Sequence, residues 1–565
     1  MTRTKDKNYV AIAERYAGGV VSGKIVACQW TIKACRRQID DLEKSKSKES
    51  PYKFDKKKAS RICRFIEMLP HIKGEWAKAG ARFELQPWQI FILTTVFGWI
   101  RKDTGLRRFK TAYLEMPRKN GKSSISSGIG IYCSCADGEA GAEVYSAATT
   151  RDQAKIVWQD AWHMVEKSPG LKSTFGVSTT AHAISQIATA SRFQALSAEG
   201  NSLDGLNIHC AIVDELHAHR TRKVFDVLET ATGARAQPLL WLITTAGWDR
   251  SGICYEQRTY LTKILDAVIQ DDTYFGIIYT IDDEDDWSDP AIWAKANPNF
   301  GASVFPEDIE RLCAKALKMP SAQNNFLTKR LSVWVNADSA FFNMAALAKC
   351  VDPRLRADDF SGERCWIGID LASRRDIAPI IQLFLRDGHF YAFGRYYLPE
   401  SEIEESGNSQ YSGWSRQGLV TLTPGNIIDY GYIEDDLRVI SRECEVAEVA
   451  YDPFQATQFA TRMLAEGFPM VEMRAIVKTF SEPMKHLDAL IMNGKFHYDG
   501  DPILTWMLSN VVAHYDNKDN VYPKKDRSEN KIDGAIALIM AIGRAMAGDA
   551  KFKKSIYETR DLIII

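Results

Sequence analysis

The stretch Glu115-Met-Pro-Arg-Lys-Asn-Gly-Lys-Ser-Ser124 follows an apolar strand near 109–116 and runs into a helix of small residues. This strand–loop–helix order is the context that a phosphate-binding loop requires. In such a loop Gly121 lets the backbone approach the phosphates, Lys122 reaches the β- and γ-phosphates, and Ser123 holds Mg²⁺. The usual pattern starts with a glycine five residues before the central one, and this chain has methionine there. The sequence predicts a nucleotide site, with a basic surface turn as the alternative.

Composition sets loose bounds on the rest of the molecule. A chain of 565 residues has room for two or three domains, each with its own core. Its 72 basic and 72 acidic residues balance, so no global field commits it to nucleic acid or to a membrane. No signal peptide is recognisable, and the longest apolar runs, 91–100 and 535–542, are too short to span a bilayer. We therefore expect a reduced, cytosolic protein without a membrane partner.

The eleven cysteines are scattered without a repeated spacing. Cys133 and Cys135 are the only close pair, and they lie in the helix that follows the loop. We interpret them as core packing rather than as a metal site.

Two patterns follow one another along the chain. From about 60 to 340, strands alternate with helices, which predicts an α/β domain with a largely parallel sheet. Its strands are expected near 109–116, 142–148, 192–197, 208–214 and 239–245. From about 362 the pattern is a meander of three strands with a turn at Asp387-Gly388. Before both, residues 8–43 are predicted to be helical, and the lysine-rich stretch 44–58 to be a solvated linker or a binding patch.

Two adjacent carboxylates end the apolar strand His209-Cys-Ala-Ile-Val-Asp-Glu-Leu-His217. Packing alone does not explain them, since burying a charge is costly unless the charge is used. Asp214 is expected to hold the Mg²⁺ shell, and Glu215 to orient and deprotonate the attacking water. Two further strands fall between the loop and this pair, an order that suits motor ATPases better than GTPases or small kinases. The alternative is a strand-end pair that faces solvent.

Three more polar residues are candidates for the same site. Thr244 and Thr245 end the next strand, where a polar side chain in a motor ATPase can sense the γ-phosphate and couple hydrolysis to movement. Threonine is also common at strand ends without such a role. Gln89 lies upstream in Pro-Trp-Gln, at the start of a helix, and is placed either to contact an adenine edge or to cap the helix.

Three aspartates stand out in the second half of the chain. Asp370 lies near the end of the first strand of the meander, Asp452 ends a later strand, and Asp533 begins an apolar helix. This order of elements predicts a ribonuclease-H-like fold, in which the first and fourth strands are neighbours and the helix brings the third carboxylate to them. Carboxylate oxygens suit a pair of Mg²⁺ or Mn²⁺ ions that cleave a phosphodiester. Each aspartate alone has an ordinary role as a helix cap or turn residue. Asp376 and Asp526 are either auxiliary ligands or turn residues.

Positive charge flanks these carboxylates. Basic side chains placed there can neutralise DNA phosphates without distinguishing sequence. A solvated basic loop that stays clear of DNA is the alternative. The candidates in the loop 522–527, after it and in the first hairpin are Lys524, Lys525, Lys531, Arg374 and Arg375.

Taken together, these residues resemble the large terminase subunit of tailed double-stranded DNA bacteriophages. The match rests on Pro-Trp-Gln89, the loop Arg-Lys-Asn-Gly-Lys-Ser123, Ser-Ala-Ala-Thr-Thr-Arg-Asp-Gln153, Leu-Asp-Gly-Leu-Asn with Val-Asp-Glu-Leu-His217, and Thr-Thr-Ala-Gly247. It covers roughly residues 10 to 545. The resemblance implies an ATP-driven motor that moves DNA into a procapsid and also cuts concatemeric DNA.

The resemblance also carries residue roles onto this chain. A γ-phosphate contact from within the loop falls on Arg118 or Lys119. The trans-acting arginine of many relatives stands in a Leu-Arg-Gly context, and here that triplet is Leu203-Asp204-Gly205. Unranked substitutes are Arg192, Arg220, Arg222 and Arg235. The full set expected to bind ATP is Gln89, Arg118, Lys119, Asn120, Gly121, Lys122, Ser123, Ser124 and Asp214.

The expected organisation follows from both halves. We expect an N-terminal helical segment with a basic linker (1–60), a P-loop ATPase domain of the RecA-like class (61–345), a linker (346–361), a ribonuclease-H-like nuclease domain (362–548) and a tail (549–565). The cofactors would be ATP with Mg²⁺ in the first site and two Mg²⁺ or Mn²⁺ ions in the second.

The resemblance further implies partners and a location. The partners would be double-stranded DNA, the portal protein, the small terminase subunit and an accessory nuclease. The chain would form a ring when docked and be a monomer in isolation, in the cytoplasm of the host cell. Two rivals stay open: a helicase or restriction-type translocase, which would need a second RecA-like domain, and a packaging ATPase whose C-terminal half only binds DNA or portal.

Overall fold

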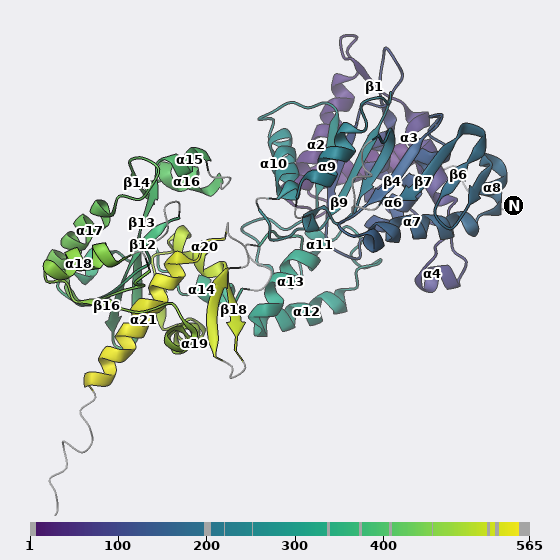
Figure 1. The fold of residues 1–565 in the computed structure, drawn as a ribbon. Coiled ribbons are helices and arrows are strands. Elements are labelled where there is room, and N and C mark those ends of the chain that lie inside the picture. Colours follow the sequence, from purple (N-terminus) through teal and green to yellow (C-terminus); the bar gives the residue numbers. More distant parts are fainter. Residues whose placement is uncertain are drawn as a thin grey trace, which may run out of the picture. The chain divides into compact units, whose positions relative to one another are not determined.

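The computed structural model describes residues 7–196, 205–219, 221–250, 252–335, 340–371, 376–405, 409–454, 456–516, 520–525 and 530–552. The chain divides into two compact units (Figure 1). The first comprises 1–314 with 325–335, and the second 315–324 with 336–565. In the described part of the chain no helix has the length and apolarity that a membrane span needs.

The first unit opens with five helices, and all of them except the short helix Gly74–Lys78 contribute buried residues to its core. They are α1 (Tyr9–Val21), α2 (Gln29–Lys44), α3 (Lys56–Glu67), α4 (Gly74–Lys78) and α5 (Pro87–Gly98). Tyr16 of α1 bonds through its hydroxyl to that of Tyr279, which follows the last strand of the sheet, at 3.2 Å. The described part of the segment 1–60, which was expected to precede the ATPase domain, therefore contributes to its core from Tyr9 onward.

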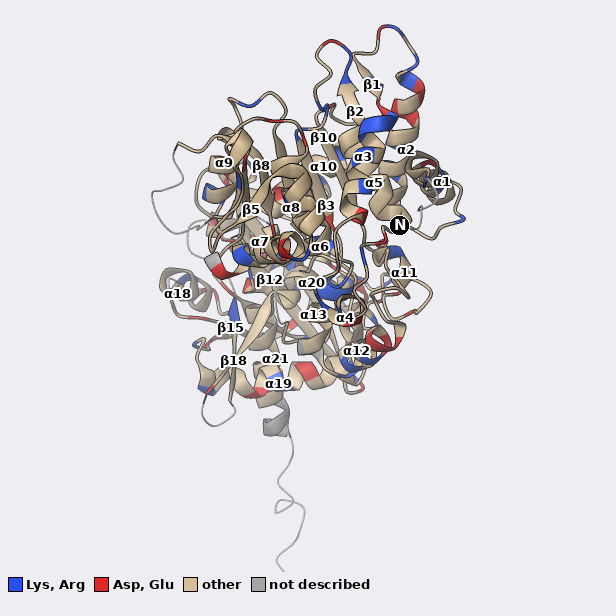
Figure 2. Ribbon diagram, turned by 90° about the vertical axis from the view of Figure 1, so that its right-hand side faces the viewer, with Lys and Arg blue, Asp and Glu red and all other residues tan. Residues whose placement is uncertain are grey.

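The lysine-rich stretch 44–58 is not a free linker. It contains β1 (Tyr52–Phe54), which pairs antiparallel with β2 (Trp99–Arg101), and then the start of α3. Asp55 caps α3 by accepting from the backbone amides of Lys57 and Lys58. Its lysines remain mostly exposed, and basic residues gather on α3, whereas elsewhere Lys and Arg are interspersed with Asp and Glu (Figure 2).

The sheet of the first unit has the strand order β10-β3-β9-β8-β4-β7-β6-β5. The strands from β10 to β7 are parallel, as expected. Three strands were not among those expected: β10 at one end of the sheet, and β6 and β5, which add an antiparallel edge at the other. Their bounds are β3 (Thr111–Glu115), β4 (Glu143–Ala147), β5 (Val177–Thr179), β6 (Ile184–Gln186), β7 (Ser191–Ala195), β8 (Ile208–Val213), β9 (Leu239–Thr244) and β10 (Tyr274–Ile278).

Helices cover both faces of this sheet (Figure 1). One face packs on α1, α2, α3 and α5 and on α6 (Lys122–Cys135), α7 (Arg151–Glu166) and α8 (Pro169–Phe175). The other packs on α9 (Lys223–Thr230) and α10 (Ile253–Leu265). Because both faces are covered, β8 and β9 are buried at every position, which explains their unbroken apolar runs. After β10 come α11 (Trp293–Ala296), α12 (Pro306–Lys318) and α13 (Pro320–Arg330).

The second unit contains a seven-stranded mixed sheet. Its order is β14-β13-β12-β11-β15-β16, with β17 paired to β13. β11, β12 and β13 form the expected antiparallel meander, and β15 lies parallel beside β11. The bounds are β11 (Arg364–Ile369), β12 (Ala378–Arg386), β13 (His389–Pro399), β14 (Thr421–Thr423), β15 (Glu445–Tyr451), β16 (Met470–Glu472) and β17 (Phe496–Tyr498).

Helices also cover both faces of this second sheet. One face packs on α14 (Met344–Ala348), α16 (Ser409–Arg416), α19 (Val477–Met492), α20 (Pro502–Ser509) and α21 (Asp533–Phe552). The other packs on α17 (Tyr430–Glu443) and α18 (Thr457–Ala465), and α15 (Ser401–Glu405) follows β13. Residues 346–361, expected to be a linker, therefore contribute in part to this core through Leu347 and Cys350.

The stretch 522–527, expected to be a loop, is partly a strand. β19 (Val521–Lys525) pairs antiparallel with β18 (Val511–Tyr515) and packs beside α19. The helix α21 reaches Phe552, three residues beyond the expected start of the tail, and residues 553–565 lie outside the described part.

One glycine sets how closely α21 approaches the sheet. A Cβ atom at Gly368 of β11 would lie 1.8 Å from the carbonyl oxygen of Ala537. Only a residue without a side chain permits this contact between a strand and a helix backbone. The contact lies two residues before Asp370 and one helical turn after Asp533, so it holds the two elements that carry these carboxylates together.

Candidate functional site

The loop between β3 and α6 has the backbone shape that an anion site needs. Lys119 and Gly121 both have positive φ, 73° and 82°, which directs successive backbone amides towards one side. A Cβ at Gly121 would meet the amide nitrogens of Gln89 and Asn299, at 3.6 and 3.7 Å. A residue with a side chain would be strained here and would also fill the mouth of the loop.

Lys122 is buried at the start of α6, and its ammonium lies over the loop. Nζ donates to the carbonyl oxygens of Met116 and Pro117, at 2.6 and 3.0 Å. Burial, with the charges of Arg118 and Lys329, lowers the pKa of Lys122 to about 8, although the charges of Glu215 and Asp214 act in the opposite direction. A phosphate would therefore meet a poorly solvated cation that holds only neutral acceptors.

Two asparagines outside the loop brace it, and the sequence analysis missed both. The side chain of Asn120 donates to Asn297 Oδ1 at 3.0 Å and accepts from the backbone amide of Asn299 at 3.1 Å. Asn299 donates back to the carbonyl oxygen of Asn120, and Ser303 donates to that of Lys119. The signal that could have found them is Asn-Pro-Asn299, two carboxamides in a turn.

Gln89 takes the capping position in this structure. Its Oε1 accepts from the backbone amide of Gln86 at 2.9 Å, and the two residues form a capping box at the start of α5. Its Nε2 faces Gly121, as the 3.6 Å separation from a Cβ there indicates. Capping and a ligand contact are therefore compatible, and the adenine role stays a prediction.

Asp214 directly follows β8 and approaches the first turn of α6, where Ser123 and Ser124 lie. Ser123 Oγ donates to Asp214 Oδ2 at 3.4 Å, and the backbone amide of Glu215 donates to Oδ1 at 2.8 Å. Burial and the charge of Glu215 raise the pKa of Asp214 to about 6, against the effect of Lys122. A hydroxyl beside a carboxylate that lacks a full counter-charge fits a Mg²⁺ ion held near both.

Glu215 has a backbone conformation that few residues of its kind adopt, with φ at 51°. Its Oε1 lies 4.0 Å from Arg118 Nε, and its Oε2 lies 3.2 Å from His217 Nδ1. Within the described residues Oε2 is buried and accepts no hydrogen bond. An oxygen held in this way is available to a water molecule, as a general base requires.

The strand-end threonines bond to His217, a residue to which the sequence analysis gave no role. Thr244 Oγ1 accepts from the backbone amide of His217 at 3.0 Å and lies 3.1 Å from its Nδ1. Thr245 Oγ1 accepts from Lys329 at 3.3 Å. The end of β9 is thus linked to the turn that carries Glu215, which is compatible with the expected coupling role.

The three aspartates of the second unit converge. Asp370 directly follows β11, Asp452 directly follows its parallel neighbour β15, and Asp533 is the first residue of α21. Burial raises the pKa of Asp370 well above its ordinary value, and the charges of Asp533 and Asp452 raise it further. Burial and the charge of Asp376 raise the pKa of Asp533 to about 6. Such repulsion is the condition that divalent cations relieve.

Asp452 also organises the loops around it. Its Oδ1 accepts from the backbone amide of Phe454 at 2.8 Å, and its Oδ2 accepts from that of Ala475 at 2.7 Å. These bonds fix the orientation of the carboxylate.

The basic candidates differ in their surroundings. The charge of Lys525 lowers the pKa of Asp370 and of Asp533, so this side chain acts at the carboxylates, whereas Lys524 is exposed. Lys531 forms an ion pair with Asp376, one of the two auxiliary candidates. The expected contacts from Arg374 and Arg375, and the role of Asp526, lie outside the described residues.

The substitutes for a trans-acting arginine are mostly engaged within the unit. Arg192 pairs with Glu143, Arg222 with Asp226 and Glu256, and Arg235 with Glu139. Arg220 and the residues Leu203 and Asp204 lie outside the described part of the chain. The trans-acting residue stays unassigned.

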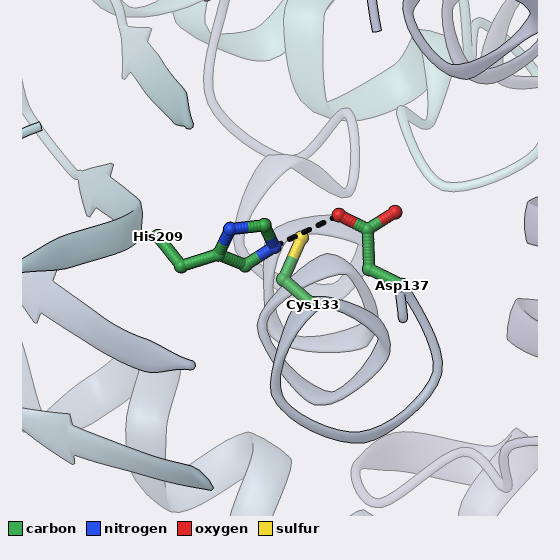
Figure 3. Close-up of side chains that lie close together, drawn as sticks. All are labelled: Cys133, Asp137 and His209. Atoms are coloured by element: carbon green, nitrogen blue, oxygen red, sulfur yellow. Dashed lines mark hydrogen bonds and ion pairs between the residues drawn. The ribbon is translucent and has the colours of Figure 1, made fainter. Parts of the chain in front are cut away.

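A separate cluster at the other end of α6 offers possible metal ligands. Ligand atoms of Cys133, Asp137 and His209 lie within 4.8 Å of one another (Figure 3). However, Arg107 and His209 both bond to Asp137 Oδ2 at 2.9 Å. Although burial disfavours its charged form, these two neighbours lower the pKa of Asp137, while burial raises that of the Cys133 thiol. We interpret the cluster as a charge-balanced core network, in line with the expectation for Cys133.

Comparisons with known proteins identify two domains in this chain. The family model of the terminase large subunit ATPase domain matches residues 87–263, and that of its endonuclease domain matches residues 268–549. Protein YmfN of Escherichia coli K12 is 39% identical over 357 residues, which cover 61% of this chain and 78% of that protein. The large terminase subunit of Enterobacteria phage HK97 is 28% identical over 499 residues, 86% of this chain and 95% of that one.

Among solved structures, the HK97 large terminase matches with a TM-score of 0.43 and 26% identity, over 86% of this chain and 99% of that one. The family assignment rests on two domain models that together span most of the chain and on a relative at 39% identity. The chain belongs to the family of terminase large subunits, with a P-loop ATPase domain followed by an endonuclease domain of the ribonuclease-H type.

Proposed function

We propose that the first unit hydrolyses ATP with Mg²⁺ at the loop 118–124 and that the second cuts DNA with two Mg²⁺ or Mn²⁺ ions at the three aspartates. The packaging activity of the family would then use both: hydrolysis moves double-stranded DNA into a procapsid, and cleavage separates one genome from the concatemer. The observation that carries the proposal is that carboxylates at strand and helix ends meet at each site beside cationic side chains. The pKa is raised for Asp214 at the first site and for Asp370 and Asp533 at the second.

At the first site each residue has a distinct role. The amides of the loop and Lys122 bind the β- and γ-phosphates, and Ser123 with Asp214 holds Mg²⁺. Glu215 accepts a proton from the attacking water through its unbonded Oε2. Arg118, whose side chain is half exposed and reaches towards Glu215, is the loop cation free to turn to a γ-phosphate. Gln89, Lys119, Asn120 and Ser124 complete the pocket, and Thr244 and Thr245 couple it to movement.

At the second site Asp370, Asp452 and Asp533 would hold the metal ions, whose chemistry there would be to activate a water molecule and to stabilise the leaving oxygen. Lys525 and Lys531 bring the phosphate backbone to the carboxylates, with Lys524, Arg374 and Arg375 further out.

Partners follow from the family rather than from contacts. We infer that the chain assembles as a ring on the portal protein, receives DNA through the small terminase subunit and an accessory nuclease, and works in the host cytoplasm as a monomer until it docks. The rival of a translocase with a second RecA-like domain lacks support, since the second unit carries a meander with three converging carboxylates.

A crossed pair of variants tests the proposal on the full-length protein. Lys122→Ala should abolish ATP turnover and keep Mn²⁺-dependent nicking of plasmid DNA, because the two sites lie in different units. Asp452→Ala should do the reverse. Wild-type turnover in the first variant removes the nucleotide assignment, and wild-type nicking in the second removes the carboxylate assignment.

A further inference from the structure

A lysine of α13 contacts the nucleotide site from a segment that the sequence motifs do not include. Lys329 Nζ lies 2.9 Å from His217 Nε2 and donates to Thr245 Oγ1 at 3.3 Å. An ammonium has three donors and no acceptor, so Nε2 of the ring must accept. The proton of a neutral imidazole is then on Nδ1.

The other ring nitrogen faces the carboxylate. His217 Nδ1 lies 3.1 Å from Thr244 Oγ1 and 3.2 Å from Glu215 Oε2. Because the hydroxyl of Thr244 donates to the carbonyl oxygen of Thr245, it is left to accept from Nδ1–H. The same tautomer of His217 therefore satisfies both its hydrogen bond with Lys329 and its hydrogen bond with Thr244.

The surroundings keep this ring neutral. Burial, together with the charges of Lys329, Lys122 and Arg118, lowers the pKa of His217 to about 2. A neutral ring has only one N–H, so the partner of Nε2 decides which way that N–H points. Without Lys329, the ring could place its proton on Nε2 and turn an acceptor towards Glu215.

We propose that Lys329 is a positioning residue for ATP hydrolysis, which fixes the tautomer of His217 and so keeps an N–H donor beside the carboxylate of Glu215. Because that N–H bonds to Thr244 Oγ1, Oε2 of Glu215 accepts no hydrogen bond within the described residues and stays open to water. This inference rests on the proposed role of Glu215 as the base. Lys329 lies in the first compact unit, with the other residues of the site, although it comes from a segment far along the chain.

The test replaces Lys329 by a residue of similar length without donors. For Lys329→Met in the full-length protein we expect kcat for ATP to fall about 10- to 100-fold, in the range of lost proton-transfer geometry. The KM for ATP and the affinity for a fluorescent ATP analogue should stay within about twofold, because the lysine acts through histidine and not on phosphate. An unchanged urea transition of the first unit, together with the retained analogue affinity, reports that its fold is intact. Lys318→Met, an exposed lysine on α12, is the matched control.

A second background isolates the relay. His217→Asn keeps a donor near the position of Nδ1 but offers Lys329 no ring acceptor. Adding Lys329→Met to His217→Asn should therefore lower kcat no further, whereas independent effects would multiply.

Three outcomes would overturn the proposal. Unchanged kcat in Lys329→Met means that the tautomer is fixed without it. A loss of analogue affinity with unchanged kcat makes Lys329 a phosphate ligand instead. An undiminished effect in the His217→Asn background means that histidine is not the intermediary. Glu215→Gln distinguishes a failure of this inference from a failure of the proposed function. If Glu215→Gln turns over ATP normally, Glu215 is not the base. If it is inactive while Lys329→Met is normal, Glu215 is the base but Lys329 does not position it.

Discussion

In the first unit, cations of the same unit surround the strand-end carboxylates. They are Arg118 of the loop, Lys122 and Lys329 of α13, and their charges influence the carboxylates or one another. In the second unit, three aspartates converge, and the two lysines whose charges act on them leave the pKa of two of these carboxyls raised. The first site carries its own positive charge and suits an anion with one metal ion. The second site has an excess of negative charge and suits metal ions before DNA.

The comparison also concerns how each site is held. In the first, backbone conformations with positive φ and carboxamide braces shape a loop. In the second, the ends of two parallel strands and the start of one helix bring the carboxylates together, and a close backbone contact at Gly368 sets the helix. The first site therefore depends on local loop geometry, and the second depends on the packing of α21.

The largest expected effect comes from breaking that packing. In Gly368→Ala the new methyl group would collide with the carbonyl oxygen of Ala537, so α21 and Asp533 must shift. The cost should reach or exceed the roughly 3 kcal/mol upper end of ordinary overpacking. We expect loss of nicking and an earlier urea transition for the second unit, with ATP turnover retained. Gly413→Ala, where no atom lies within 4 Å of the new Cβ, is the control. Normal nicking by Gly368→Ala would show that the site tolerates a displaced helix.

Replacing Asp533 by a neutral amide tests whether the second site carries an excess of negative charge. In Asp533→Asn cutting should be lost, yet the metal-free protein should become more stable. The pKa of Asp533 is about 6 when folded against an ordinary 3.8, so the carboxylate destabilises the fold progressively as pH rises from about 4 to 6 and fully above that. A pKa that is higher by about two corresponds to about 3 kcal/mol of unfolding free energy, which is an upper limit because part of the side chain reaches solvent.

The stability gain is measured by urea unfolding in EDTA. It should be present at pH 8 and nearly absent at pH 4, where the wild-type carboxyl is also protonated. Equal stability of the two proteins at pH 8 would mean that burial and the charge of Asp376 do not raise the pKa of Asp533 in solution.

Opposite pH limits should distinguish the two sites. Metal binding to the second site must displace protons below about pH 6, so Mn²⁺ affinity should fall by up to about tenfold per pH unit for each proton displaced there. Nucleotide binding without metal should weaken instead above pH 8, because the pKa of Lys122 is lowered to about 8 and the neutral amine attracts phosphate less. Calorimetry of Mn²⁺ and of ADP in EDTA measures both limits. A nucleotide affinity that is flat from pH 7 to 9.5 would show that Lys122 keeps its charge.

The sequence was sufficient to predict a feature wherever a local pattern is compatible with only one kind of structure. The parallel sheet followed from unbroken apolar runs, since strands covered on both faces need them at every position. The three aspartates could be placed together because topology alone makes β11 and β15 neighbours. The loop 115–124 was recognisable despite Met116, because its context and its Gly-Lys-Ser core were intact.

The rest depended on long-range packing that no local pattern encodes. The N-terminal helices look like a separate segment, and only the folded core shows that Tyr16 meets Tyr279. Asn297 and Lys329 act at the nucleotide site from far along the chain, so neither lies within a motif. The stretch 522–527 carries a Pro and several charges, which disguised an edge strand.

The smallest expected effect separates two neighbouring lysines of β19, whose side chains point to opposite faces of the hairpin. The charge of Lys525 acts on Asp370 and Asp533, whereas Lys524 is exposed. Each lysine that neutralises a phosphate contributes about 0.9 to the salt slope of duplex binding. Lys525→Ala should therefore flatten the slope by about 0.9 on any duplex and also raise the pKa of both carboxyls, so cutting requires a higher pH. Lys524→Ala should at most flatten the slope.

Salt titrations with two unrelated duplexes in EDTA, together with the pH profile of nicking, measure both effects. If the two variants shift the nicking profile alike, the hairpin does not present one lysine to the metal site and the other to solvent, and the carboxylates are screened by residues elsewhere.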